Sequence, residues 1–202
     1  RTQTVEQYDG TSWTEVNNVL DGRGYTAGCG ITTASLFIGG YHPAGPVYRT
    51  QVVEEFNGSS WAEIADLQNA INSQGAAPQG TVTAALIFGG YSGPGPATRA
   101  ELWNGTSWTE VGDLNSSRSS PMGAGASTDA LAVGGQPAAV EKNVESWNGT
   151  SWTETSYDMG SGGYKGAYGG SATSAFVAGR SPFSNITEEL GNAPAIKTFT
   201  SS

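Results

Sequence analysis

The stretch VEQYDGTSWTEV, residues 5–16, decides the fold because the chain repeats it. Similar stretches occupy Val53–Ile64, Ala100–Val111 and Val144–Thr155. Their tryptophans are Trp13, Trp61, Trp108 and Trp152, which lie 48, 47 and 44 residues apart. A period of this length fits a repeat of four short strands with turns, and it exceeds the periods of ankyrin, tetratricopeptide and leucine-rich repeats. The repeat therefore predicts a series of small β-sheets.

Each copy has the pattern of a β-hairpin. At its centre lies a dipeptide of Asp or Asn followed by Gly: Asp9-Gly10, Asn57-Gly58, Asn104-Gly105 and Asn148-Gly149. A two-residue type I′ turn requires positive φ at both central residues, which Asn, Asp and Gly adopt most easily. We therefore expect a type I′ turn in each copy. In the first arm, Glu6 precedes Tyr8 by two residues, so period-two alternation places both side chains on one face.

A second signature precedes each later copy of the hairpin. It is an apolar run that ends in a pair of small residues: Gly39-Gly40, Gly89-Gly90, Gly134-Gly135 and Ala178-Gly179. Short strands of small residues suit close packing of sheets near a central axis. The two signatures alternate in fixed order and together make one repeat unit.

These residues resemble the kelch repeat family, in which an apolar strand ends in a double glycine and is followed by Glu before an aromatic residue, a turn and Trp. Arg23 and Arg118 lie where kelch repeats often carry arginine, whereas Ser73 and Gly162 depart from that pattern. The resemblance implies an all-β fold, a β-propeller of kelch-like four-stranded blades with the glycine-pair strand inside and the Trp strand outside. The amino-acid sequence of the repeat is also similar to that of kelch-like structural and tail proteins of tailed phages, especially marine ones.

The order of the signatures predicts four full repeats plus an N-terminal half blade. The hairpin signature occurs once more than the inner-strand signature, if Ile186–Asn192 is counted as a degenerate copy without Trp. We expect one propeller domain, or part of one, over residues 1–202. Its parts are an outer hairpin at 2–16 and blades at about 23–64, 74–111, 118–155 and 163–200. Either residues upstream of Arg1 complete a ring of about five to seven blades, which we favour, or an oligomer supplies the missing strands.

Charge and hydropathy exclude two classes of partner. The net charge is −9 and only 13% of residues are charged, so nonspecific binding to the phosphate backbone of nucleic acids is not expected. No apolar run reaches the roughly 18 residues that a membrane span needs, so membrane insertion is not expected either.

One cysteine and one histidine restrict the possible chemistry. Cys29 has no partner for an intramolecular disulfide, and we expect it to be buried in a strand between glycines. His42 alone cannot build a zinc site, which takes three or four protein ligands. By resemblance, a copper oxidase on kelch blades would need two histidines and a tyrosine crosslinked to cysteine. We therefore expect no metal, no cofactor and no catalytic residues.

The loops that follow the small-residue pairs differ between repeats, although the strands around them are nearly copied. Such variation is typical of a rigid scaffold that carries recognition loops. Aromatic faces and guanidinium groups in these loops suit stacking on sugars or binding of a carboxylate. The candidate binding residues are Tyr41, His42, Tyr48, Arg49, Tyr91, Arg99, Arg180 and Phe183.

The expected function is that of a non-enzymatic structural or binding module, located in a virion or outside the cell. Its expected partners are other virion or surface proteins and a host glycan or receptor. Two alternatives stay open: an extracellular carbohydrate-active or lectin-like propeller, and an intracellular kelch adaptor that binds a partner protein. Adaptors of that kind usually present a basic pocket, whereas this chain has nine basic residues against eighteen acidic ones.

Overall fold

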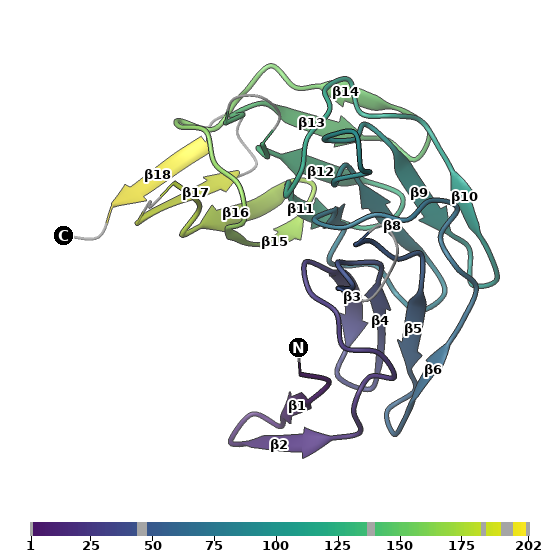
Figure 1. Cartoon of the computed structure of the whole chain (residues 1–202). Coiled ribbons are helices and arrows are strands. Elements are labelled where there is room, and N and C mark those ends of the chain that lie inside the picture. The colour runs from purple at the N-terminus through teal and green to yellow at the C-terminus, as the bar shows by residue number, and fades with distance from the viewer. Residues whose placement is uncertain (1, 44–47, 137–139, 183–184, 191–195, 201–202) are drawn as a thin grey trace.

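Every regular element that the computed structural model describes is a β-strand. The described residues are 2–43, 48–136, 140–182, 185–190 and 196–200. Within them, four antiparallel four-stranded sheets are arranged as the blades of a β-propeller, and a two-stranded sheet precedes them (Figure 1). The predicted all-β propeller fold is confirmed.

The strands follow one another in chain order within each sheet. The N-terminal hairpin consists of β1 (Val5–Tyr8) and β2 (Trp13–Val16). Blade 1 contains β3 (Ala27–Ile31), β4 (Ala34–Ile38), β5 (Val53–Phe56) and β6 (Trp61–Glu63). Blade 2 contains β7 (Gly75–Ala76), β8 (Ala85–Phe88), β9 (Ala100–Trp103) and β10 (Trp108–Glu110). Blade 3 contains β11 (Met122–Gly125), β12 (Ala130–Val133), β13 (Val144–Trp147) and β14 (Trp152–Glu154). Blade 4 contains β15 (Ala167–Ser171), β16 (Ser174–Ala178), β17 (Ile186–Leu190) and β18 (Ile196–Thr200). Figure 1 shows the blades along an arc from the purple hairpin to the yellow blade 4.

The hairpin turns differ from the predicted type. Tyr8 pairs with Trp13, so the first turn contains four residues rather than two. The Asp9 carboxylate accepts hydrogen bonds from the backbone N–H groups of Thr11 and Ser12, at 2.7 and 2.8 Å. Only the glycine of the pair has positive φ, +100° at Gly10. The type I′ prediction was wrong because the Asp or Asn side chain acts here as a hydrogen-bond acceptor, as in an Asx turn. The turns at Asn57, Asn104 and Asn148 repeat this arrangement.

Each repeat tryptophan begins the outermost strand of its hairpin and packs against an aromatic residue on the strand before it. The predicted equivalence of the four tryptophans is confirmed. Ring centroids lie 5.1–5.4 Å apart in the pairs Tyr8–Trp13, Phe56–Trp61, Trp103–Trp108 and Trp147–Trp152.

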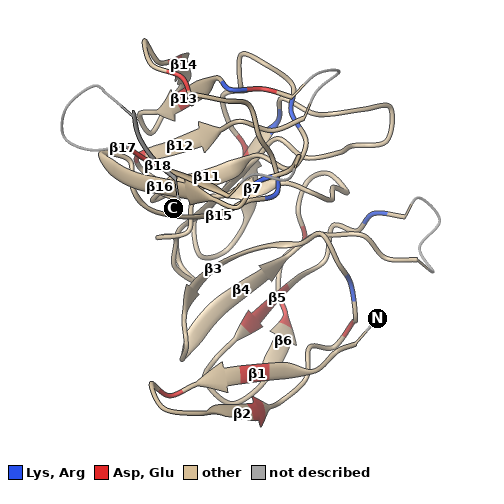
Figure 2. Cartoon of the chain, turned by 90° about the vertical axis from the view of Figure 1, so that its left-hand side faces the viewer, with Lys and Arg blue, Asp and Glu red and all other residues tan. Residues whose placement is uncertain are grey.

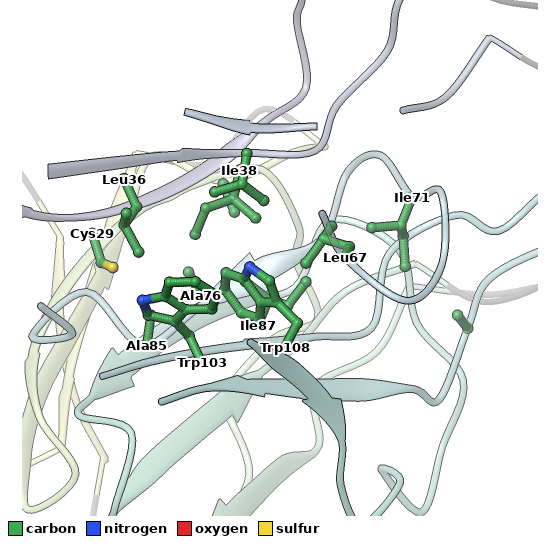
Figure 3. Close-up of a cluster of buried hydrophobic side chains, with 13 residues drawn as sticks. Cys29, Leu36, Ile38, Leu67, Ile71, Ala76, Ala85, Ile87, Trp103 and Trp108 are labelled. Carbon is green, nitrogen blue, oxygen red and sulfur yellow. The ribbon is translucent and has the colours of Figure 1, made fainter. Parts of the chain in front are cut away.

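The core lies between neighbouring blades. Trp103 and Trp108 of blade 2 pack toward Leu36 and Ile38 of blade 1 (Figure 3). Each of these four residues is at most 3% exposed. Trp147 and Trp152 of blade 3 belong to the corresponding cluster with blade 2. In blades 2 and 3, the aromatic pair thus covers the face of the preceding blade.

Cys29 lies in the cluster between blades 1 and 2, as expected for a buried strand thiol. Burial raises its pKa to about 12. Because the thiolate is the nucleophile, we expect Cys29 to react slowly with thiol reagents at neutral pH while the protein is folded.

A buried glutamate accompanies each interblade aromatic contact. Its carboxylate accepts a hydrogen bond from a backbone N–H in the connection that leaves the preceding blade. The bonds are Leu20 to Glu54 (2.6 Å), Gln68 to Glu101 (2.8 Å), Asn115 to Glu145 (2.7 Å) and Gly160 to Glu188 (2.9 Å). We call the glutamate and the aromatic pair of one hairpin the interblade clamp. Blade 4 has the glutamate without the tryptophan.

The clamp of the N-terminal hairpin is exposed. Tyr8 and Trp13 are 45% and 67% exposed, whereas Trp108 is 2% exposed. Glu6 is also exposed, and Figure 2 shows acidic segments on β1, β2 and β5. In the described part of the chain, no blade precedes this hairpin to receive its side chains.

The difference in burial predicts a difference in stability. Trp108→Ala is expected to lower the free energy of unfolding by about 3–5 kcal/mol, because it removes a buried aromatic ring and leaves a cavity between two blades. Trp13→Ala is the matched control, with an expected loss below about 1 kcal/mol at an exposed site. Urea unfolding followed by circular dichroism measures both. Equal losses would contradict the assignment of the Trp108 ring to the interblade core.

Candidate functional site

The variable loops emerge at one end of the propeller, and a backbone bridge secures each of them. The bridge joins the segment before the first strand of a blade to the segment after its second strand. The bridged pairs are Gly24 and Tyr41, Asn72 and Tyr91, Ser119 and Gln136, and Tyr164 and Ser181. The Asx turns lie at the other end of the strands. This arrangement places the loops that follow the glycine pairs on one rigid face.

Four residues with positive φ form a row at this end. Tyr25, Ser73, Ser120 and Lys165 each lie just before the first strand of a blade, and their φ values lie between +52° and +56°. The Ser73 N–H donates to the Tyr25 carbonyl (2.8 Å), the Ser120 N–H to the Ser73 carbonyl (2.6 Å), and the Lys165 N–H to the Ser120 carbonyl (3.3 Å). Positive φ costs free energy in residues other than glycine, and these interblade hydrogen bonds help to stabilise the backbone in this conformation. We call these four residues the axial row.

The two ends of the axial row approach one another through their side chains. The Lys165 ammonium lies 5.3 Å from the centroid of the Tyr25 ring and 5.7 Å from that of Tyr164. Both distances fit cation–π contacts. Among the described residues Lys165 forms no ion pair. Its positive charge is therefore not neutralised by a described carboxylate.

Two loop tyrosines join Tyr25 in an aromatic cluster. The rings of Tyr41 and Tyr48 are stacked, with centroids 5.8 Å apart and planes 11° from parallel. The Tyr25 ring meets Tyr41 edge-on at 6.3 Å. Tyr25 and Tyr48 are each more than half exposed. We call Tyr25, Tyr41 and Tyr48 the tyrosine cluster.

A hollow of about 140 Å³ lies beside the tyrosine cluster. Its lining residues are Tyr25, Thr26, Ser73, Gln74, Ser120, Pro121, Lys165 and Tyr168. The Gln74 side chain is buried, and its carbonyl oxygen has no hydrogen-bond partner within the described residues. Burial raises the pKa of the Tyr168 phenol. The site thus combines an aromatic face, hydroxyl groups and one cation.

Other predicted loop residues lie apart from this cluster or are bound to neighbours. The His42 ring nitrogen lies 3.1 Å from the Asp21 carboxylate. Arg49 packs against Gly93 of the next blade. Arg99 donates to the Asn69 side chain at 3.1 Å. Tyr91 is 40% exposed on blade 2, and Phe183 lies outside the described residues.

Arg180 belongs to the core rather than to the loop face. It is 1% exposed and forms an ion pair with the buried Glu188. Arg118 makes the equivalent pair with Glu145 at 2.5 Å, and Arg23 with Glu54 at 3.0 Å. A guanidinium pair with this glutamate therefore occurs in blades 1, 3 and 4.

Arg180 also corrects the position of the fourth small-residue pair. Gly39, Gly89, Gly134 and Gly179 share φ values between +56° and +62°, so Gly179 is the first residue of its pair and Arg180 replaces the second glycine. The predicted pair Ala178-Gly179 was displaced by one residue. Gly163 takes the place that Arg23 and Arg118 hold in their blades, and a Cβ there would lie 2.0 Å from Cδ of Arg180. The arginine has thus changed position within the blade while keeping its glutamate partner.

Sequence reasoning missed Tyr25, Tyr164 and Lys165. All three precede the first strand of a blade and lie outside the variable loops that follow the small-residue pairs. The sequence does contain a signal for two of them. Tyr25 and Lys165 align with Ser73 and Ser120, so blades 1 and 4 carry a large side chain where blades 2 and 3 carry serine. Their meeting across the propeller depends on the curvature of the blades, which the repeat spacing does not specify.

No protein-family model matches the chain, and no curated protein matches it. Within the described residues, no cluster of three or more His, Cys, Asp or Glu side chains is placed to hold a metal ion. The described part of the chain contains no helix that is long and apolar enough to cross a membrane.

Exchange of the arginine position provides a test of the blade 4 assignment. Arg180→Gly leaves Glu188 buried without its cation, and the expected loss of unfolding free energy is about 3–5 kcal/mol. Gly163→Arg alone introduces a side chain into space that Arg180 fills. In the double variant the introduced guanidinium can reach Glu188, so the loss is expected to be at least about 1 kcal/mol smaller than the two single losses together. Additive losses in thermal or urea unfolding would contradict the exchange.

Proposed function

We propose that this chain is a non-enzymatic, kelch-like binding module of a virion or an extracellular surface, which recognises an acidic glycan through its loop face. The observation that carries the proposal is the convergence of the tyrosine cluster and Lys165 at the axial hollow. Host receptors that display such a glycan are the expected partners.

The chemistry of the loop face favours a sugar with a carboxylate. Tyrosine rings offer flat apolar faces with a polar tip, which suit the faces of pyranose rings. The ammonium of Lys165 supplies a charge for the carboxylate, and the hydroxyl groups of Ser73 and Ser120 supply hydrogen-bonding groups. The chain as a whole is acidic, so this local cation favours a small anion over an extended polyanion.

The proposed setting rests on the sequence. The double glycine, the Glu before an aromatic residue and the repeat Trp support the kelch-like classification. The similarity of the repeat sequence to that of structural and tail proteins of tailed phages supports the assignment of this chain to a virion. The low content of charged residues is compatible with a surface built for assembly and attachment.

Three substitutions test the binding face. Tyr25→Ser installs the residue that blades 2 and 3 carry at the same position, Tyr48→Asn keeps a residue that accepts positive φ, and Lys165→Met removes the charge while keeping a long side chain. Each is expected to weaken binding to oligosaccharides with a sialic or uronic acid by about tenfold or more, equivalent to about 1.4 kcal/mol. Glycan arrays followed by titration calorimetry measure the loss.

Tyr91→Ala is the matched control, because Tyr91 is an exposed tyrosine at the same end of the propeller but belongs to blade 2, outside the tyrosine cluster and the residues that line the hollow. It is expected to retain binding. If Tyr91→Ala abolishes binding while the three cluster variants retain it, the recognition surface lies elsewhere on the loop face. If the unmodified chain binds neutral and acidic oligosaccharides equally, the role assigned to Lys165 is wrong.

A further inference from the structure

Three of the hairpin turns carry Asn-Gly where the first carries Asp-Gly. At Asn57, Asn104 and Asn148 the side-chain oxygen accepts hydrogen bonds from the second and third following backbone N–H groups, at 2.9–3.0 Å. The Asp9 carboxylate accepts the same two bonds at 2.7 and 2.8 Å. The turn therefore holds an amide and a carboxylate in the same arrangement.

The residue after each of these asparagines is a glycine with an accessible backbone nitrogen. Gly58, Gly105 and Gly149 have φ between +91° and +92° and lie on exposed turns. Among the described residues, no group accepts a hydrogen bond from their N–H groups. Because glycine has no Cβ, no side chain of its own crowds the nitrogen. Each turn thus has an unhindered backbone nitrogen directly after the asparagine.

The N–H groups that bind the asparagine oxygen also activate its side-chain carbonyl. At Asn148, the N–H groups of Thr150 and Ser151 both lie 2.9 Å from Oδ1. When a nucleophile adds to Cγ, negative charge develops on Oδ1, and donors that already point at this atom stabilise that charge. Asn57 and Asn104 have the same pair of donors. The turn therefore combines a nucleophile with an activated carbonyl.

We propose that Asn57, Asn104 and Asn148 are sites of self-modification, at which the following glycine converts the asparagine to aspartate or isoaspartate. The glycine nitrogen forms a bond to Cγ, the Cγ–Nδ2 bond breaks, and the amide leaves as ammonia with the proton of the glycine nitrogen. The product is a five-membered succinimide. Water then opens this ring: addition at Cγ gives aspartate, and addition at the backbone carbonyl carbon of the asparagine gives isoaspartate. The sequence consumes one water, releases one ammonia and requires no oxidant or reductant.

Asp9 shows how the turn accommodates the aspartate product. Hydrogen bonds from the backbone N–H groups of Ser12 and Thr11 lower the pKa of its carboxyl group. The equivalent donors stabilise an ionised aspartate at each converted turn, because hydrogen bonds to the charged form favour that form. Each conversion to aspartate adds one negative charge to a net charge of −9. The new charges lie at the end of the strands opposite the loop face, so the modification is separate from the proposed glycan site.

Asn115 is an internal control with a different environment. It precedes Ser116 rather than a glycine. Its Nδ2 group, which would have to leave, donates to the Glu145 carboxylate at 2.9 Å and to the Trp152 carbonyl at 3.1 Å. By contrast, the side chains of Asn104 and Asn148 make their described hydrogen bonds through Oδ1 alone. We therefore expect Asn115 to remain an amide.

Incubation of the folded full chain at mildly alkaline pH, followed by peptide mapping with mass spectrometry, measures conversion at each asparagine. The three turn asparagines are expected to convert at least about tenfold faster than Asn115, with isoaspartate among the products as the mark of a succinimide. Conversion is expected to slow at mildly acidic pH, because the glycine nitrogen attacks after it loses its proton. Asn148→Asp is the matched variant: it releases no ammonia at residue 148, while Asn57 and Asn104 still convert.

A synthetic peptide of residues 144–155 separates the effect of the turn from that of the Asn-Gly dipeptide. Asn148 is expected to convert at least as fast in the folded chain as in this peptide, because the folded turn holds both donors on Oδ1. Slower conversion in the folded chain would show that the turn protects the amide, and would overturn the proposal. Absence of conversion in the folded chain, or equal rates at Asn115 and the three turns, would overturn it as well.

Discussion

The rest of the structure depends on the contact by which each hairpin attaches to the preceding blade. In blades 2 and 3 the aromatic pair covers the apolar face of the preceding blade, and the glutamate accepts hydrogen bonds from the connection that leaves it. Short strands of small residues cannot bury enough apolar surface within one sheet, so stability comes from the contact between repeats. The same contact sets the order of the blades, and through it the position of every loop on the binding face.

Burial of a glutamate at each contact requires compensation, and the blades provide it differently. In blade 3, Arg118 donates to Glu145 and to the carbonyls of Gly134 and Asn143. In blade 2 no arginine pairs with Glu101 among the described residues, and burial raises the pKa of this glutamate, opposed by hydrogen bonds from Gln68 and Asn69. The arginine is therefore an addition to the contact, whereas the backbone hydrogen bonds occur in all four blades. This explains why the arginine can change position in blade 4 without loss of the fold.

Local signals in the sequence were sufficient for the fold. The tryptophan spacing, the glycine pairs and the Glu before an aromatic residue report strand positions and faces, because period-two alternation and backbone conformation are local properties. The turn type was wrong because the Asn side chain can either accept positive φ or cap the turn, and the dipeptide does not distinguish these roles. Arg180 was assigned to a loop because its partner Glu188 lies on a neighbouring strand, a contact that spacing alone does not reveal. Tyr41 and Tyr48 were among the predicted binding residues, but the approach of Lys165 from blade 4 to their neighbour Tyr25 depends on how far the blades curve.

If the contact between a hairpin and the preceding blade stabilises the protein, Trp108 and Leu36 are energetically coupled, and a double-mutant cycle between these two residues measures the coupling. Leu36→Ala, Trp108→Ala and the double variant are compared by urea unfolding under conditions where the transition is two-state. We expect a coupling energy of at least about 1 kcal/mol, because the two side chains belong to one interblade cluster. Losses that add within about 0.3 kcal/mol would show that the two side chains do not stabilise the protein through a shared contact between the blades.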